Sequence, residues 1–162
     1  MIKVITIILL ILLSPLFLII SIAILLDDGF PIFFKQKRVG KNNQIFMIYK
    51  FRTMKNESPN IASHLLSKSK SYYTKTGPFL RKFSLDELPQ LINIFKNDIS
   101  YIGPRPALYN QKDLIQKRTL KGIHRLYPGI TGWAQVNGRD ELTISEKVNM
   151  DLYYLNNKSL KL

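Results

Sequence analysis

An apolar run near the N-terminus, broken by a proline, constrains the fold more than any other part of the sequence. The run covers residues 4–26, and Ser14, Pro15 and Ser21 interrupt it. A straight helix of that length measures about 34 Å, enough to cross a bilayer. Pro15 removes the backbone hydrogen bond to the Ile11 carbonyl and bends the helix. The sequence therefore predicts a bent apolar helix, in which Ser14 is placed to bond a freed backbone group.

Two membrane arrangements are open for this run. Two legs of about 11 residues rise about 16 Å each, roughly half the hydrocarbon thickness, so a bent helix enters and leaves by the same face. A plain single span is the alternative. Basic residues flank both ends, which a re-entrant shape with both ends in the cytoplasm satisfies; they are Lys3, Lys35, Lys37, Arg38 and Lys41. Because no small-residue cleavage site follows the run, we expect the segment to stay in the mature protein.

Composition limits the class of the protein and its partners. A chain of 162 residues suits one domain with a core of its own. It has no cysteine, which excludes disulfides and thiolate metal sites. A net charge of +13, from 24 basic and 11 acidic residues, implies an anionic partner such as a lipid surface, a nucleotide or a nucleic acid. Charge alone does not choose among these.

Two adjacent carboxylates, Asp86 and Glu87, lie where an amphipathic helix is expected to begin. Leu88, Leu91, Ile92 and Phe95 have the spacing of one buried helix face. The first helical residue is ambiguous, because Ser84 and Glu87 have capping-box spacing whereas Pro89 prefers the first helical position. Either start places both acids at the positive end of the helix dipole and points them roughly 100° apart. One carboxylate is then available to a substrate while the other holds a metal or a proton; simple helix capping is the alternative.

Two further charged residues stand in informative surroundings. Arg105 lies between Pro104 and Pro106, whose rings restrict the backbone, so its guanidinium is well mounted for a bidentate phosphate contact. Asp151 lies beside the inner face of a predicted C-terminal helix, where an ion pair with Arg139 or Arg105 is the simplest interpretation. A structural turn with an incidental arginine is the alternative for Arg105.

Residue patterns indicate the remaining elements. Residues 30–51 read as a β-hairpin whose turn contains Gly40, Asn42 and Asn43. Residues 107–126 are expected to be helical, and residues 127–140 form a glycine-containing loop that can bring backbone N–H groups and Arg139 to a phosphate. A capping box opens the last helix; it is made by Thr143 and Glu146, and the inner face carries Ile144, Val148, Leu152 and Leu155.

Six motifs occur in order along the chain: residues 14–15 (SP), 36–40 (QKRVG), 49–54 (YKFRTM), 81–91 (RKFSLDELPQL), 103–106 (GPRP) and 128–139 (PGITGWAQVNGR). Together they resemble the bacterial sugar transferase family, the monotopic polyprenol-phosphate phosphoglycosyl transferases. The resemblance covers essentially the whole chain.

The resemblance implies an α+β, mainly helical fold around a cytoplasmic active site. Residues 1–28 would be a re-entrant membrane helix broken at Ser14 and Pro15. Residues 29–162 would be a membrane-associated catalytic domain, with a β-hairpin and surface-lying amphipathic helices, at the cytoplasmic face of the inner membrane. The implied reaction moves a sugar 1-phosphate from a UDP-sugar to undecaprenyl phosphate and releases UMP, with Mg²⁺ as cofactor. It would open the synthesis of an exopolysaccharide, O-antigen, capsule or glycoprotein glycan.

The resemblance also implies roles for single residues. Asp86 would be the nucleophile that forms a phosphosugar-aspartate, Glu87 its partner, and both would hold the metal. Arg105, Arg81, Arg139 and Asp151 would bind substrate phosphate or complete the site. Membrane lipid is an expected partner and nucleic acid is not; downstream glycosyltransferases and a homodimer stay open.

Two other hypotheses compete with the transferase. A membrane-anchored basic module that binds anionic lipid or nucleic acid would account for the charge but has no need of Asp86 and Glu87. Family members continue past residues 156–159 with an apolar and basic segment, whereas this chain stops at Leu162, so a catalytically inactive fragment is the third hypothesis. Neither the sugar nor the glycan can be read from the residues.

Overall fold

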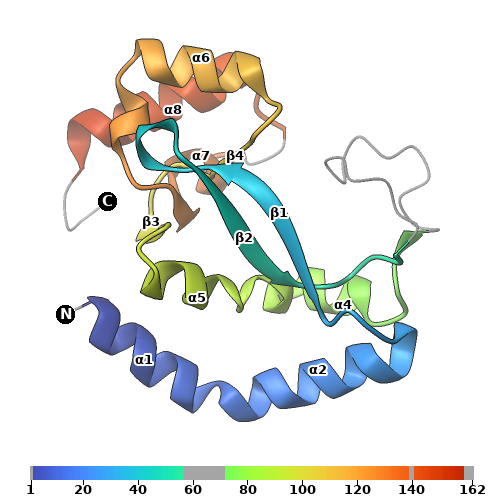
Figure 1. Cartoon of the computed structure of the whole chain (residues 1–162). Helices are drawn as coiled ribbons and strands as arrows, with labels where there is room; N and C mark the ends of the chain where they lie inside the picture. Colours follow the sequence, from blue (N-terminus) through green and yellow to red (C-terminus); the bar gives the residue numbers. More distant parts are fainter. Residues whose placement is uncertain (1, 57–71, 139–140, 159–162) are drawn as a thin grey trace. The chain divides into compact units, whose positions relative to one another are not determined.

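The structure, a computed structural model, describes residues 2–56, 72–138 and 141–158 (Figure 1). The described chain is α+β, with more helix than strand, as expected. It forms two compact units, the first from residues 1–35 and 49–95 and the second from residues 36–48 and 96–162. The predicted division at residue 28 separates a membrane segment from the rest of the chain, and it stays a prediction.

In the first unit the apolar run is bent, as the proline predicts. It forms α1 (Ile2–Leu12) and α2 (Ser14–Asp28), whose axes differ in direction by 55°. Pro15 lies in the first turn of α2, and the Ser14 hydroxyl donates to the Ile11 carbonyl over 2.7 Å. This confirms the predicted replacement of the hydrogen bond that Pro15 cannot make. No single helix of the described residues is long and apolar enough to cross a membrane, while the bent pair reaches that length and hydropathy together.

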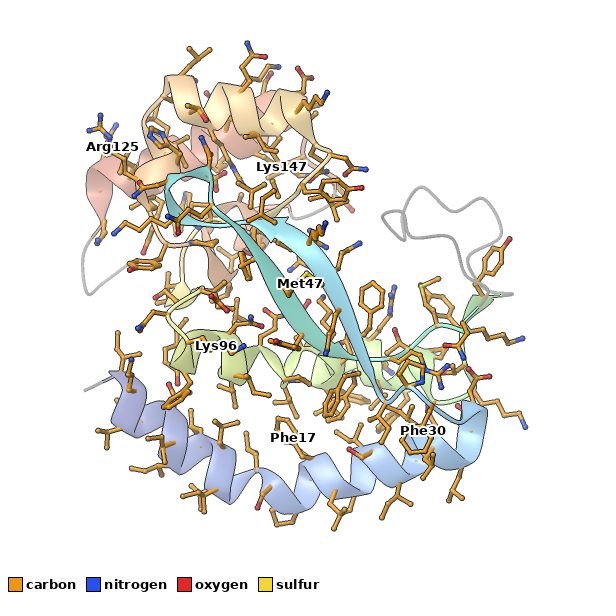
Figure 2. The ribbon with its side chains drawn as sticks, viewed as in Figure 1. Phe17, Phe30, Met47, Lys96, Arg125 and Lys147 are labelled. Carbon is orange, nitrogen blue, oxygen red and sulfur yellow. The ribbon has the colours of Figure 1, made fainter. Side chains whose placement is uncertain are left out.

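One side of α2 packs into the core of the first unit. Ile20 and Ile24 are buried against Phe51 and Leu80, and the Phe17 ring lies 5.3 Å from that of Phe51 (Figure 2). The opposite side carries exposed large apolar residues that continue along α1; they are Ile2, Val4, Ile5, Ile7, Ile8, Ile11, Leu12, Leu18, Ile19, Ile22, Leu25 and Leu26. Such a continuous exposed apolar surface is typical of a contact with lipid or protein.

The predicted hairpin is confirmed. Strands β1 (Phe33–Val39) and β2 (Ile45–Phe51) are neighbours in a three-stranded sheet with the order β2-β1-β4. A 3₁₀ turn at Lys41–Asn43 joins them, and Asn42 and Asn43 both take the positive φ that asparagine tolerates. Both strands run from one unit into the other.

The helix expected after the two acids is shorter than predicted. The acids lie on a 3₁₀ turn, Leu85–Glu87, after α4 (Gly77–Lys82), and α5 begins only at Gln90 and ends at Phe95. Ser84 has a φ of 55° and its side chain caps nothing, so the capping box with Glu87 is wrong. The alternative start, set by Pro89, agrees with the structure.

The predicted buried face of this helix is only partly correct. Leu91 is buried, but so are Ile94 and the polar Gln90 and Asn93, while Phe95 is 42% exposed. The apolar spacing assumed one continuous α-helix, and the 3₁₀ turn ahead of α5 breaks that geometry. Helix α5 packs on α1, and the Asn93 side chain accepts a hydrogen bond from the Tyr49 amide, so buried contacts are not confined to one face.

The second unit differs from the prediction between residues 107 and 140. Ala107–Leu108 forms strand β4, antiparallel to β1, and only Lys112–Leu120 (α6) and a 3₁₀ turn at Ile123–Arg125 are helical. The predicted glycine loop contains β5 (Gly129–Thr131), parallel to β3 (Ser100–Ile102), followed by α7 (Trp133–Val136). Strand pairing with distant residues decides these elements, and local pattern does not report it.

The last helix, α8 (Ile144–Asn157), begins as predicted. The Thr143 hydroxyl accepts from the Glu146 amide, and the Glu146 carboxylate accepts from the Thr143 amide over 2.7 Å, which completes the capping box. Val148 is buried in a core cluster on which Leu152 and Leu155 also pack, whereas Ile144 is exposed. The inner face therefore starts one turn later than expected.

Candidate active site

Asp86 and Glu87 lie together in the first unit, on the short 3₁₀ turn. Asp86 is 7% exposed, and Glu87 is half-buried. The Glu87 carboxylate accepts from the Lys50 ammonium over 2.6 Å, and Lys50 comes from the end of β2. No ion pair with Asp86 occurs in the part of the chain that the structure describes. Glu87 therefore forms an ion pair with Lys50, whereas the Asp86 carboxylate forms no ion pair among the described residues.

Arg81 is the second cation, after Lys50, whose charge lowers the pKa of Asp86. Its Nε donates to the Thr53 hydroxyl over 2.9 Å and its Nη1 to the Tyr73 hydroxyl over 3.0 Å. The guanidinium carbon also lies 4.9 Å from the Tyr73 ring centre, within the range of a cation–π contact. These contacts fix the arginine without neutralising it, so its positive charge stays available.

The electrostatics of Asp86 follow from these neighbours. Burial is the largest influence and raises the pKa of Asp86 above its usual value. The charge of Lys50 lowers it, that of Glu87 raises it, and that of Arg81 lowers it. A carboxylate that is poorly solvated and only partly compensated is more reactive towards an electrophile than one in water.

The residues around Asp86 fit a magnesium ion of the kind that the resemblance implies. No group of three or more His, Cys, Asp or Glu is gathered anywhere in residues 2–56, 72–138 and 141–158, which argues against a closed protein cage. Mg²⁺ is usually bound by one or two carboxylates together with substrate phosphates and water. Asp86 and the neighbouring Glu87, whose Oε1 bonds Lys50, are the one or two carboxylates that such a site would use.

The remaining predicted site residues are distributed as follows. Ser14 and Pro15 lie at the bend of the apolar helix pair in the first unit. Arg105 and Asp151 belong to the second unit, and Arg139 lies outside the described residues. Asp151 is 1% exposed and forms its ion pair with Arg118, which donates from Nε over 2.9 Å and from Nη2 over 2.7 Å. Among the described residues the ion-pair partner of Asp151 is therefore Arg118 and not the predicted Arg105; the other predicted partner, Arg139, lies outside them.

Sequence reasoning missed two functional candidates, Lys50 and Arg118. The sequence gives Lys50 no role of its own, yet its side chain is only 15% exposed and bonds Glu87. A basic residue near the end of a helix, as Arg118 is in α6, needs no role beyond favouring the helix dipole. Alternation along β2 was an available signal for Lys50, since it lies two positions after the buried Ile48 and therefore on the same face of the strand. No sequence signal pairs Arg118 with Asp151.

Comparison with known proteins identifies a family and several relatives. The family model described as bacterial sugar transferase matches residues 2–162. The chain is 43% identical over 134 residues to the sugar transferase EpsL of Bacillus subtilis, covering 83% of this chain and 65% of EpsL.

Two other relatives have names that state a reaction. The UDP-glucose:undecaprenyl-phosphate glucose-1-phosphate transferase of Escherichia coli is 39% identical over 155 residues, covering 90% of this chain and 33% of that protein. The UDP-N-acetylgalactosamine-undecaprenyl-phosphate N-acetylgalactosaminephosphotransferase of Aeromonas hydrophila is 38% identical over 152 residues, covering 91% and 36%. The chain thus spans about two thirds of EpsL and about a third of the other two. The match over essentially the whole chain shows that the protein belongs to the bacterial sugar transferase family.

Proposed function

We propose that the protein transfers a sugar 1-phosphate from a UDP-sugar to undecaprenyl phosphate and releases UMP. Two relatives named for this reaction differ in the sugar but share the UDP donor and the undecaprenyl-phosphate acceptor. The observation that carries the proposal is the pair of a buried Asp86 and a half-buried Glu87, with Lys50 and Arg81 around it. A purely basic binding surface has no need of a buried carboxylate.

The proposed reaction has two displacements at phosphorus. In the first, a carboxylate oxygen of Asp86 attacks the β-phosphorus of the donor, the bond from that phosphorus to the bridging oxygen breaks, and UMP leaves with the oxygen. In the second, a phosphate oxygen of undecaprenyl phosphate attacks the same phosphorus, and the Asp86 carboxylate leaves. The lipid-linked diphosphate sugar and the unmodified aspartate result, so the atoms balance.

Cations near Asp86 address the main obstacle, which is the approach of one anion to another. Arg81 is held by Thr53 and Tyr73, and Lys50 is held by Glu87, so both positive charges are in place before the donor binds. Preorganised charge of this kind is the largest contribution to many enzymatic rates. When bound to Asp86 and Glu87, Mg²⁺ would neutralise charge on the diphosphate.

Residues of the second unit have proposed roles in donor binding. Arg105 would bind phosphate through its guanidinium, supported by its position between Pro104 and Pro106. Arg139 and Asp151 keep the roles that the family resemblance gives them. We place the protein at the cytoplasmic face of the inner membrane, with the bent pair α1–α2 re-entering that face. Tags on either end of the chain are then accessible from the cytoplasm.

Incubation of the membrane-bound protein with labelled UDP-sugars, undecaprenyl phosphate and Mg²⁺ tests the proposed reaction. The expected products are UMP and a lipid-linked diphosphate sugar, and chelation of Mg²⁺ should stop their formation. With acceptor omitted, mass spectrometry of the protein should locate a phosphosugar adduct on Asp86.

One result would reject the proposed reaction, and another would reject the proposed nucleophile. The first is the absence of product across a broad panel of UDP-sugars, especially if the protein binds anionic vesicles with a steep salt dependence, which would favour a basic binding module. The second is an adduct on another side chain, which would leave the reaction standing but remove Asp86 as nucleophile.

A further inference from the structure

Residues 103–106 form a segment whose backbone is bonded on several sides within the second unit. The Gly103 amide donates to the Thr131 carbonyl over 2.9 Å, and the Pro104 carbonyl accepts from the Gly129 amide over 3.0 Å. The packing is also close, because a Cβ atom on Gly103 would lie 2.3 Å from the Tyr127 carbonyl oxygen. Strand β5 and Tyr127, two residues before it, therefore fix the first half of the segment.

Two arginine side chains hold the second half. Arg118 Nη1 donates to the Arg105 carbonyl over 2.8 Å. Arg38 Nη1 donates to the Pro106 carbonyl over 3.0 Å. Because the prolines have no N–H group, this backbone is fixed mainly through hydrogen bonds that its carbonyl oxygens accept. The two guanidinium groups thus fix consecutive carbonyls, one of them that of Arg105 itself.

Each of these arginines is in turn fixed by a buried polar residue. Arg118 places two N–H groups on the carboxylate of Asp151, which is 1% exposed. Arg38 Nη2 donates to the Gln36 side-chain oxygen over 2.7 Å, and Gln36 is 8% exposed. A guanidinium can bond a carboxylate and a carbonyl at once because its five N–H groups lie in one rigid plane.

We propose that Arg38 and Arg118 are positioning residues that aim Arg105 by holding its backbone. The inference rests on the proposed function, in which Arg105 binds the diphosphate of the donor. It assigns Asp151 the task of orienting Arg118. A lysine at either position keeps the charge, but its single ammonium group cannot reproduce the planar set of contacts.

Measurement of UDP affinity by isothermal titration calorimetry tests this role, using the full chain in detergent with Mg²⁺. Arg105→Ala, Arg118→Lys and Arg38→Lys should each weaken UDP binding about tenfold. Arg125→Lys is the matched control, because Arg125 is an exposed arginine of the same unit whose side chain points outward (Figure 2), and it should leave the affinity unchanged.

A double-variant comparison distinguishes an effect on UDP affinity that acts through Arg105 from one caused by a general loss of stability. If Arg118 acts through Arg105, the double variant Arg105→Ala/Arg118→Lys should bind UDP no more weakly than Arg105→Ala alone. A second tenfold loss in the double variant would overturn the inference, as would unchanged affinity in both lysine variants. Should Arg118→Lys fail to fold, the same cycle with Arg38→Lys decides the question.

Turnover of a UDP-sugar, measured in parallel, distinguishes the two proposals. Wild-type protein that binds UDP in the expected pattern but forms no lipid-linked product contradicts the proposed reaction and leaves the positioning role intact. Wild-type protein that turns over while the lysine variants keep full UDP affinity contradicts the positioning role alone. Wild-type protein that does not bind UDP contradicts the positioning role as well.

Discussion

Asp86 in the first unit and Asp151 in the second are both buried acids, but their charges are balanced in different ways. Burial raises the pKa of each above its usual value. Two N–H groups of Arg118 bond the Asp151 carboxylate directly. Asp86 is instead stabilised through space by Lys50 and Arg81, whose donors are bonded to other residues. A bonded carboxylate is suited to holding a neighbour in place, whereas one balanced at a distance is suited to reacting.

The largest expected effect comes from Asp86, the acid that no cation of the described residues bonds directly. Asp86→Asn should lower turnover by at least about a thousandfold, because it removes the proposed nucleophile. Its melting temperature should be unchanged or higher, since a neutral amide costs less to bury than a carboxylate. Steady-state UMP release and thermal unfolding measure the two quantities. Asp113→Asn, on the exposed first turn of α6, is the control. Near-normal turnover of Asp86→Asn would remove the contrast drawn between the two acids.

The second effect concerns the bonded acid. Arg118→Leu should lower the free energy of unfolding by about 3 kcal/mol at neutral pH, because it leaves a carboxylate that is 1% exposed without its cation. Chemical denaturation of wild type and variant gives this difference.

The stability loss in Arg118→Leu should also depend on pH. The pKa of Asp151 is already raised by burial against the opposing charge of Arg118, and loss of that cation raises it further. An acid whose folded-state pKa is raised stabilises the fold below its unfolded pKa, and this contribution disappears as pH rises through the folded pKa. The deficit should therefore shrink under acid and grow towards neutral pH. A deficit independent of pH would mean that Asp151 is not the group responsible.

The third effect concerns Lys50, which lies near Asp86 and forms an ion pair with Glu87. Lys50→Met should lower turnover about tenfold, because it removes one of the two cations near Asp86. It should cost less stability than Arg118→Leu, since Glu87 retains 12% side-chain exposure and can be hydrated. Parallel kinetic and denaturation measurements compare the two variants. Equal stability losses would show that the two ion pairs are energetically alike.

The smallest effects come from the residues that precede the two acid-bearing elements. Thr143 precedes α8, which carries Asp151, and Ser84 precedes the 3₁₀ turn that carries Asp86. Thr143→Ala should lower the free energy of unfolding by about 1 kcal/mol, because Thr143 caps the helix that carries Asp151. Ser84→Ala should cost less than about 0.5 kcal/mol, since the Ser84 side chain caps nothing. Equal losses in thermal or chemical unfolding would contradict the difference between these two turns.

Ser84 and Thr143 also show how far the sequence can be read. Both Ser84 and Thr143 are followed three positions later by glutamate, and both patterns predict a capping box. Only Thr143 forms one; Ser84 takes a positive φ, and its glutamate binds Lys50 instead. A local pattern predicts a contact between near neighbours. A distant residue of opposite charge can bind one of those neighbours instead, and the local contact then does not form.

The sequence likewise predicts only part of the candidate site. The identity and adjacency of Asp86 and Glu87 are visible in the chain, and the family resemblance names their roles. The residues that hold charges in place were not visible, because Lys50 and Glu87 are 37 positions apart and Arg118 and Asp151 are 33 apart. The same holds for β4 and β5, which exist through pairing with other strands.

By itself, the sequence determined the features set within one turn or one side chain: the bend at Pro15 with its Ser14 hydrogen bond, the hairpin turn at Asn42 and Asn43, and the cap at Thr143. Proline, asparagine and threonine act on backbone groups only a few residues away, so neighbours alone suffice. Only the tertiary structure decided which cation meets which acid, because packing of distant segments determines which charges are left to pair.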